Sequence, residues 1–258
     1  MGRFYRSVPN RTKCGEAGQA SYNTGVDRFR ALSASPPEVI SMPLPIFPLN
    51  TVLFPGIPMP LRIFEERYLR MLADRTPNDP AFAIALIESG QEAGGSPAFH
   101  DIGTTARLLS INALASNRVD IVVVGDRRVR ISSGDWRRGY AVADTEDLAD
   151  GPHDAAETTE IAAKARDAYA TYVRGVARLV DLRFKAPALS RDAVAASFEL
   201  TSRLPLHTWE QQSILENVDP LSRIKAVKTL VDRELALLYM GGVAGVPLFY
   251  PGDRFTLN

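Results

Sequence analysis

Cysteine is nearly absent from this chain, because Cys14 is the only one among 258 residues. No intrachain disulfide can form, which fits a reducing compartment. Long apolar runs are also missing. None approaches the roughly 20 residues of a membrane-spanning helix, and the amino terminus lacks the apolar core of a secretion signal. The sequence therefore predicts a cytoplasmic protein that has no membrane partner.

The chain has no net charge, and it contains few histidines. Thirty basic and thirty acidic residues cancel, so no strong attraction to nucleic acid is implied. The three histidines, His100, His153 and His207, lie far apart in the sequence, whereas a transition-metal site needs several ligands at suitable spacing. We predict no metal, no cofactor and no nucleic-acid partner.

Motifs of common enzymes are absent too. No lysine follows a glycine in a Gly-Lys-Ser/Thr phosphate-binding loop, and there is no Gly-X-Ser-X-Gly nucleophile elbow. Ser222 and Lys225 have the spacing of a Ser-X-X-Lys pair, but the helical period places both beside a solvated face. The sequence predicts a protein that is not an enzyme, with an uncharacterised hydrolase as one alternative.

Proline is plentiful between Pro43 and Leu69, where six prolines cut short apolar runs. Proline lacks a backbone donor, so these runs are expected to be edge strands and tight turns, with Phe54-Pro55-Gly56 as a turn. A helix is predicted to begin near Phe64 and to bury Tyr68, Leu69 and Leu72.

Strand signals continue to about Leu148. They include Thr104 to Leu114 and the β-branched run Val119 to Val124, with a turn expected at Gly125-Asp126. The Gly/Ser/Pro-rich stretch from Ser89 to Pro97 reads as a loop. Short strands with tight turns and one early helix predict a small, partly closed β-barrel over residues 42–150.

Helical periodicity follows an acidic stretch from Gly139 to Ala163, which we interpret as a solvated linker with a domain boundary at Gly151-Pro152. The predicted helices have caps at Ser190, at Thr208 in a capping box, and at Asp219. One apolar face comprises Ile161, Ala165, Tyr169, Tyr172, Val176 and Leu179. Residues 151–241 thus predict a bundle of about four helices, followed by a tail over residues 242–258.

Residues 1–41 are polar, aperiodic and rich in Arg, Ser, Gly and Asn, which predicts a disordered tail. Met42 directly precedes the ordered pattern. The alternative interpretation is that translation starts at Met42 and residues 1–41 belong to a mis-called start.

Three motifs resemble the Lon protease amino-terminal (substrate-binding) domain family. The first joins Phe54-Pro55-Gly56 to Pro60-Leu-Arg-Ile-Phe-Glu65, and the second is Val122-Val-Val-Gly-Asp-Arg-Arg-Val-Arg-Ile131. The third is Gln212-Ser-Ile-Leu-Glu216 followed by Arg223. The resemblance implies an α+β protein with a small PUA-like β-barrel before a helical bundle. It also implies that Arg223 anchors the joint between them, with Gln212 to Glu216 near the last helix.

The same resemblance implies a function. In the family this domain recruits substrates, so the chain is expected to bind unfolded or partner polypeptide without catalysis, as an adaptor or chaperone-like protein. A protease encoded elsewhere is a second candidate partner. An apolar group around the proline turns gives the candidate polypeptide-binding residues Phe54, Met59, Arg62 and Phe64. The opposing interpretation is core packing for the apolar members and a simple Arg62–Glu65 salt bridge.

RNA binding is the remaining alternative. Arg127, Arg128 and Arg130, with Arg137 and Arg138, form a local basic cluster near Trp136. Binding of RNA favours basic residues interleaved with exposed aromatics. Asp126 and Asp135 dilute this charge, so we expect these arginines to lie in turns and on the surface.

Overall fold

The computed structural model describes residues 42–74, 82–114, 117–136, 138–179, 188–240 and 256–257. The predicted tail 1–41 and most of the predicted tail 242–258 lie outside the described residues. The strands are β1 (Met42–Leu49), β2 (Pro58–Ile63), β3 (Phe82–Ser89), β4 (Ala98–Leu114), β5 (Arg118–Ile131), β6 (Ala141–Asp147) and β7 (Thr256–Leu257). The helices are α1 (Glu66–Ala73), α2 (Ala155–Leu179), α3 (Ala193–Arg203), α4 (Thr208–Glu216) and α5 (Pro220–Tyr239).

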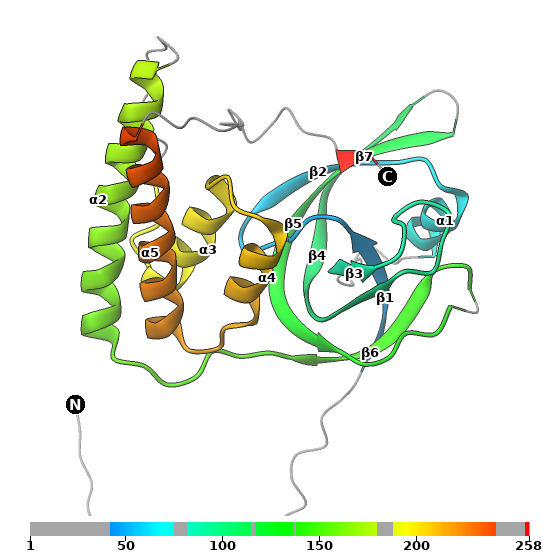
Figure 1. The fold of residues 1–258 in the computed structure, drawn as a ribbon. Helices are drawn as coiled ribbons and strands as arrows, with labels where there is room; N and C mark the ends of the chain where they lie inside the picture. Colours follow the sequence, from blue (N-terminus) through cyan, green and yellow to red (C-terminus); the bar gives the residue numbers. More distant parts are fainter. Residues whose placement is uncertain are drawn as a thin grey trace, which may run out of the picture. The chain divides into compact units, whose positions relative to one another are not determined.

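The strands form a sheet that closes on itself. Their order is β4-β3-β1-β6-β5-β2-β7, and an additional β4–β5 pairing turns the sheet into a barrel (Figure 1). Strand β5 is long enough to pair with β2 through its first half and with β6 through its last three residues. The four helices α2 to α5 follow the barrel in sequence. The α+β prediction, with a small barrel before a helical bundle, is confirmed.

Strand β1 corrects the expectation that its prolines exclude a central position. It lies between β6 and β3, yet it contains Pro43, Pro45 and Pro48. Residues 42–46 pair with β6 and residues 46–49 pair with β3, so the two pairings overlap only at Ile46. Each proline therefore has one unpaired flank toward which its missing donor can face.

Gly125 lies within the continuous strand β5, so the predicted turn at Gly125-Asp126 is wrong. Its N–H donates to the carbonyl of Ile57 (3.1 Å), and its carbonyl accepts from the N–H of Gly56 (2.8 Å). A Cβ at Gly125 would lie 2.2 Å from the carbonyl oxygen of Phe54. The glycine thus marks the place where the Phe-Pro-Gly turn rests directly on the barrel strand.

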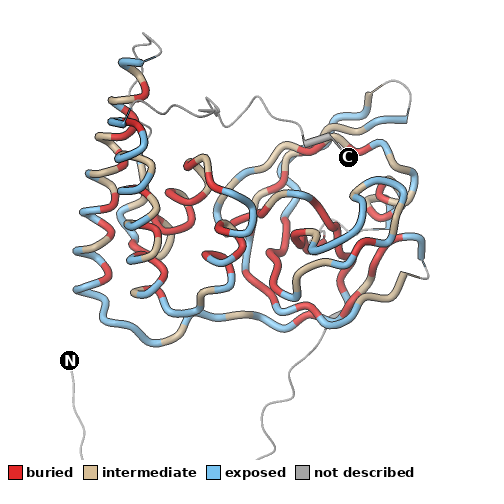
Figure 2. Tube along the Cα trace, in the orientation of Figure 1, coloured by how far each residue is buried: buried red, intermediate tan, exposed pale blue. Residues whose placement is uncertain are grey.

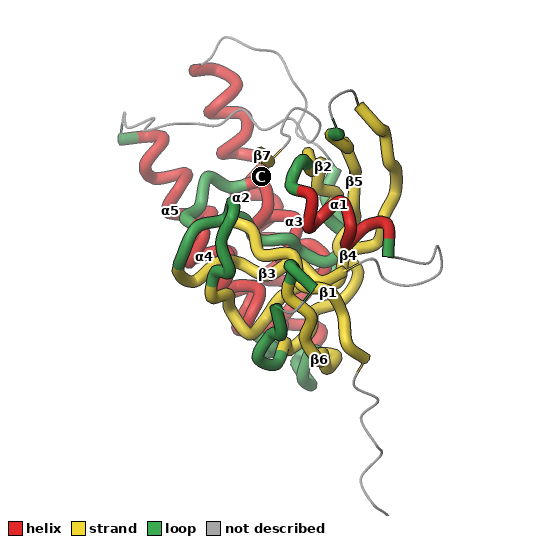
Figure 3. Tube along the Cα trace, turned by 90° about the vertical axis from the view of Figure 1, so that its right-hand side faces the viewer, coloured by secondary structure: helices red, strands yellow, loops and turns green. Residues whose placement is uncertain are grey.

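Helix α1 begins at Glu66, two residues after the predicted start, and covers one part of the barrel. Tyr68 and Met71 are its buried residues, whereas Leu69 and Leu72 are half-buried. They share a core with residues of β2 and β5, including Leu61 and Ile121. Figure 3 shows α1 beside these two strands.

The bundle confirms most of the predicted apolar face on α2. Ala165, Tyr169, Tyr172 and Val176 are buried, while Leu179 at the helix end is exposed. Two caps differ from the prediction. Asp192 caps α3 in place of Ser190, and α4 begins after His207, whose N–H donates to Glu210 (3.0 Å). Asp219 caps α5 as predicted, by accepting from the N–H groups of Leu221 and Ser222.

Arg223 joins the bundle to the barrel, as predicted. It is fully buried on α5 and forms two bonds to Asp150, at 2.6 and 2.9 Å. It also donates to the carbonyl of Asn217 (2.8 Å) and to Ser197 Oγ (3.0 Å). Its guanidinium lies 4.4 Å from the ring centroid of Phe198 on α3. Asp150 is therefore a structural anchor and not, as the sequence predicts, part of a solvated linker.

Arg128 on β5 completes this joint, which corrects its expected surface position. It is buried and donates to Asp150 (2.5 Å) and to the carbonyls of Leu215 and Asn217 (both 2.8 Å). Burial lowers the pKa of its guanidinium, and Asp150 opposes that shift. Gln212 adds a bond from α4 to the carbonyl of Ile102 on β4 (3.0 Å). Barrel and bundle thus meet through buried hydrogen-bonded groups, although Gln212 Oε1 is buried without a hydrogen-bond partner among the described residues.

Candidate functional site

Phe54 is a core residue and does not lie on the surface. It is 1% exposed, and its ring stacks on that of Phe198 with 5.8 Å between centroids. For this residue the core-packing interpretation is correct, because the Phe-Pro-Gly turn presses it between the barrel and the bundle. Ile57, from the same turn, is half-buried against the same core.

The other three candidate residues lie on or just after β2. Met59 is half-buried at the margin of the barrel core, and Phe64 is 42% exposed. Arg62 does not pair with Glu65. Its Nε and Nη2 instead donate to the two oxygens of Asp120 on β5, at 2.7 and 3.0 Å. This contact lowers the pKa of the Asp120 carboxyl and fixes Arg62 along the outer face of the sheet.

Glu65 instead contacts the loop between β3 and β4. Its Oε2 accepts from the N–H of Gly94 (3.1 Å) and lies 3.0 Å from Arg67 Nη2. Arg67 also donates to the carbonyls of Gly95 and Glu92. The predicted loop from Ser89 to Pro97 is thereby tied to the start of α1. Burial of the adjacent Tyr68 raises the pKa of its hydroxyl to about 12.

An exposed apolar strip on β4 was not predicted as a binding surface. Strand β3 pairs with β4 only as far as Phe82 opposite Ala106. Beyond that point, β4 pairs with β5 alone among the described strands. Leu108, Leu109 and Ile111 lie in this part and are 37%, 52% and 59% exposed. We call these three residues the β4 strip.

The strip continues an apolar row from the core into solvent. Leu61 on β2 pairs with Ile121 on β5, which pairs with Ile111 on β4. The first two are buried, whereas the third is exposed in the part of β4 that no longer pairs with β3. Met59, Val123 and Leu108 form the neighbouring row. Figure 1 shows these ends of β4 and β5 projecting beyond the barrel, and Figure 2 colours them as exposed or intermediate.

The sequence contained one signal for this strip. Leu108, Leu109 and Ile111 break the alternation of apolar and polar residues that a half-buried strand shows. A register shift between Leu108 and Ser110 explains the break, because Leu109 lies outside the regular ladder. Nothing in the sequence shows which edge of the strand is left unpaired.

The arginines of the predicted basic cluster have different partners and different burial. Arg127 pairs with Asp147 (2.7 Å), Arg130 pairs with Asp101 (3.2 Å), and Arg128 is buried in the joint. Arg137 lies outside the described residues, and Trp136 is half-buried. Among the described arginines of the cluster, Arg127 and Arg130 are held by separate carboxylates and Arg128 is buried, so their geometry gives RNA binding no support.

The Ser-X-X-Lys pair is exposed on α5 and is engaged elsewhere. Ser222 Oγ accepts from Asn217 Nδ2 (3.3 Å), and Lys225 Nζ lies 2.6 Å from Glu157. Within the described ranges, no group of three or more His, Cys, Asp or Glu side chains could hold a metal ion. The hydrolase alternative has no supporting geometry at these positions.

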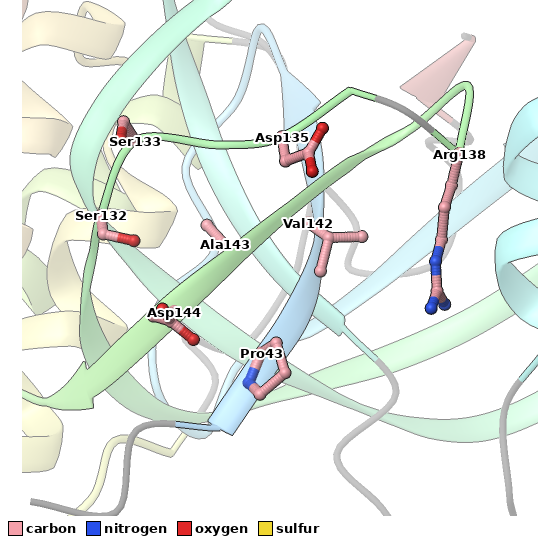
Figure 4. Close-up of a pocket in the computed structure, with 8 residues that line it drawn as sticks. All are labelled: Pro43, Ser132, Ser133, Asp135, Arg138, Val142, Ala143 and Asp144. Carbon is pink, nitrogen blue, oxygen red and sulfur yellow. The ribbon is translucent and has the colours of Figure 1, made fainter.

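A polar hollow of about 530 Å³ opens beside β6. Figure 4 shows the carboxylates of Asp135 and Asp144 on its walls, with Arg138 on the far side. Its other lining residues are Pro43, Ser132, Ser133, Val142 and Ala143. Two serine hydroxyls line it, but its described lining contains no histidine or lysine to act as their base. Separately, none of the helices in the described ranges has the length and apolar character needed to cross a membrane.

This chain is similar to known proteins of one family. Residues 43–233 match the family described as the ATP-dependent protease La (LON) substrate-binding domain. Lon protease 2 of Sorangium cellulosum is 26% identical over 80% of this chain, and Lon protease 2 of Myxococcus xanthus is 24% identical over 78%. These matches cover 26% and 25% of the two relatives, so the chain spans about a quarter of their length.

Two solved structures share the fold. The Lon N-terminal domain protein from Xanthomonas campestris is 26% identical, with a TM-score of 0.51 over 73% of this chain and 98% of that one. The N-terminal domain of the Mycobacterium avium complex Lon protease is 15% identical, with a TM-score of 0.53 over 74% and 98%. The second likeness concerns the fold alone.

Proposed function

Because the chain belongs to the ATP-dependent protease La (LON) substrate-binding domain family, we propose that it binds unfolded or partner polypeptide without cutting it. It acts as a substrate-recruiting adaptor or chaperone-like protein in the cytoplasm. Cleavage of a bound client falls to a protease encoded elsewhere. The matched region and the engaged Ser222–Lys225 pair support a role in binding rather than in chemistry.

The β4 strip is the observation on which this proposal depends. Three large aliphatic side chains are exposed along one unpaired strand edge, and such a patch marks an interaction surface. Covering the exposed half of a leucine or isoleucine contributes roughly 1 kcal/mol, so the strip contributes roughly 3 kcal/mol. Ordering an unfolded client offsets part of this gain. This gain alone corresponds to a Kd no tighter than roughly the millimolar range, so we expect weak, reversible binding.

The candidate residues of β2 extend the proposed surface. Met59 lies in the row of Leu108, two strands away, which corresponds to about 10 Å across the sheet. Phe64 adds an exposed aromatic ring at the end of β2. Arg62, fixed by Asp120, forms a polar rim. Phe54, which stacks on Phe198 in the core between barrel and bundle, is not part of this surface.

A charge placed on the strip tests the proposal. We expect Ile111→Lys to weaken binding of a fluorescein-labelled unfolded peptide at least tenfold, measured by fluorescence anisotropy. Lysine keeps its ammonium hydrated and blocks an apolar contact. Because Ile111 is largely exposed, the melting temperature should change by only a few degrees.

The matched control is Leu237→Lys on α5. Leu237 is 45% exposed but lies far from β4 in the sequence and outside the sheet. This variant should bind the peptide as the unaltered chain does. Undiminished binding by a folded Ile111→Lys variant, or an equal loss in both variants, would count against the proposed surface.

A further inference from the structure

We propose that clients bind by strand addition, in which an extended polypeptide segment pairs through its backbone with the unpaired edge of β4 over residues 107–114. This inference rests on the proposed polypeptide-binding function and specifies its mode and its ligand class. The ligand is a segment in extended conformation with apolar side chains, rather than a preformed helix or a folded surface.

The backbone of β4 supplies the pairing groups. Residues 107–114 pair with β5 on one side, from Arg107 opposite Val124 to Leu114 opposite Arg118. On the other side, β3 ends its pairing at Ala106, and no other described strand takes its place. Eight residues at about 3.4 Å each give an edge of roughly 27 Å. Alternate N–H and C=O groups along such an edge remain available to a new strand.

This edge lacks the usual protection against strand addition. Proteins commonly block free edges with proline, lysine or inward-pointing charges. The unpaired flanks of β1 contain three prolines, whereas residues 107–114 contain no proline and no lysine. Their single charge belongs to Arg107, at the beginning of the free edge. The one irregularity, the register shift beside Leu109, exposes an additional apolar side chain.

Side chains along the edge define what kind of segment fits. Leu108, Leu109 and Ile111 favour apolar partners, and strand addition combines backbone bonds with pockets for alternate side chains. Arg107 is exposed and the edge has no acidic residue. An acidic residue in the client near Arg107 is therefore favoured, and a strongly basic segment is disfavoured.

A second copy of the chain is the rival occupant. Two eight-residue edges form a small contact, well below the roughly 1,200 Å² that stable protein–protein interfaces bury. A contact of that size suits a transient client better than a lasting dimer. Light scattering on the full chain distinguishes them. A dimer that forms at micromolar concentration and dissociates in the Ile111→Lys variant would overturn the proposal.

Backbone chemistry in the ligand provides the main test. We compare three labelled peptides with identical side chains, namely an unmodified apolar peptide, one with every amide of its apolar core N-methylated, and one with the same number of N-methyl groups in its flanks. Fluorescence anisotropy with the full chain measures each affinity. Core methylation removes the donors needed for strand pairing, so we expect at least a tenfold loss, whereas flank methylation should leave affinity unchanged.

The outcomes separate the two claims. Equal affinity for the core-methylated and unmodified peptides overturns strand addition, while binding itself still supports the proposed function. If none of the peptides binds and unfolded protein does not bind either, the proposed function fails and the inference fails with it. A second arm exchanges an acidic flank for a basic one, and Arg107→Glu should reverse the resulting preference. A preference that Arg107→Glu leaves unchanged contradicts the assigned charge contact.

Discussion

Removing the carboxylate of Asp150 is expected to destabilise the protein more than removing either arginine that it holds. Asp150→Asn preserves shape but leaves Arg128 and Arg223, both buried, without a compensating negative charge. An uncompensated buried charge costs about 3–5 kcal/mol. We expect a loss of this size in the free energy of unfolding.

Arg223→Met should cost less, although Arg223 is the more deeply buried partner. After this change Arg128 still donates to Asp150 and to the carbonyl of Asn217. Ser197 still donates to the carbonyl of Val194 (2.6 Å). Asp150 Oδ1 and the carbonyl of Asn217 keep a donor, while Oδ2 of the partly exposed Asp150 loses its contact with Arg223. Methionine fills much of the vacated volume, so we expect a loss of roughly 1–2 kcal/mol.

Urea unfolding of the full chain, followed by circular dichroism, measures both losses. The control is Asp147→Asn, because Asp147 pairs with Arg127 on the surface, where such pairs contribute about 1 kcal/mol or less. If Asp150→Asn cost no more than Arg223→Met, the charge of Asp150 would not be what holds the joint together.

Two other predictions concern the barrel strand and the bundle. Gly125→Ala should destabilise the protein by about 2–3 kcal/mol in urea unfolding, because its Cβ would overlap the backbone of Phe54. A smaller loss of stability than that caused by Gly94→Ala, at an exposed glycine, would refute this reasoning. Arg233 lowers the pKa of Glu210, so this pair stabilises the fold above the ordinary carboxyl pKa near 4.5 and the gain disappears as pH falls through the lowered value. Acid melts of Glu210→Gln should therefore be flatter with pH than those of the unaltered chain, and parallel curves would contradict it.

Sequence patterns predicted the helices and strands better than they predicted which strands pair with one another. The apolar face of α2 and the cap of α5 at Asp219 follow from spacing alone, because helical contacts are local. The prolines of β1 wrongly predicted an edge strand, because proline is excluded from a central strand only where that strand is paired on both sides along its full length. The structure divides the pairing of β1 at Ile46 instead.

Long-range contacts explain the other differences. Gly125 resembled a turn residue, but its partner is Phe54, 71 positions earlier in the sequence. In the sequence, Arg128 resembles its exposed neighbours. In the structure it is buried because it donates to Asp150 and to the carbonyl of Asn217, which are distant in the sequence. The β4 strip was missed for the same reason, because exposure depends on where β3 stops pairing. The family resemblance predicted the joint at Arg223, which composition and periodicity alone do not reveal.

Amide hydrogen exchange shows whether a bound polypeptide pairs with the free edge of β4. The full chain is exchanged alone and with a saturating unfolded peptide, and protection is read along β4. Strand addition predicts slower exchange at alternate amides of residues 107–114 in the presence of peptide, because a new strand accepts hydrogen bonds from that edge. Saturable binding that leaves these amides unchanged, or that protects only the helical bundle, would contradict it.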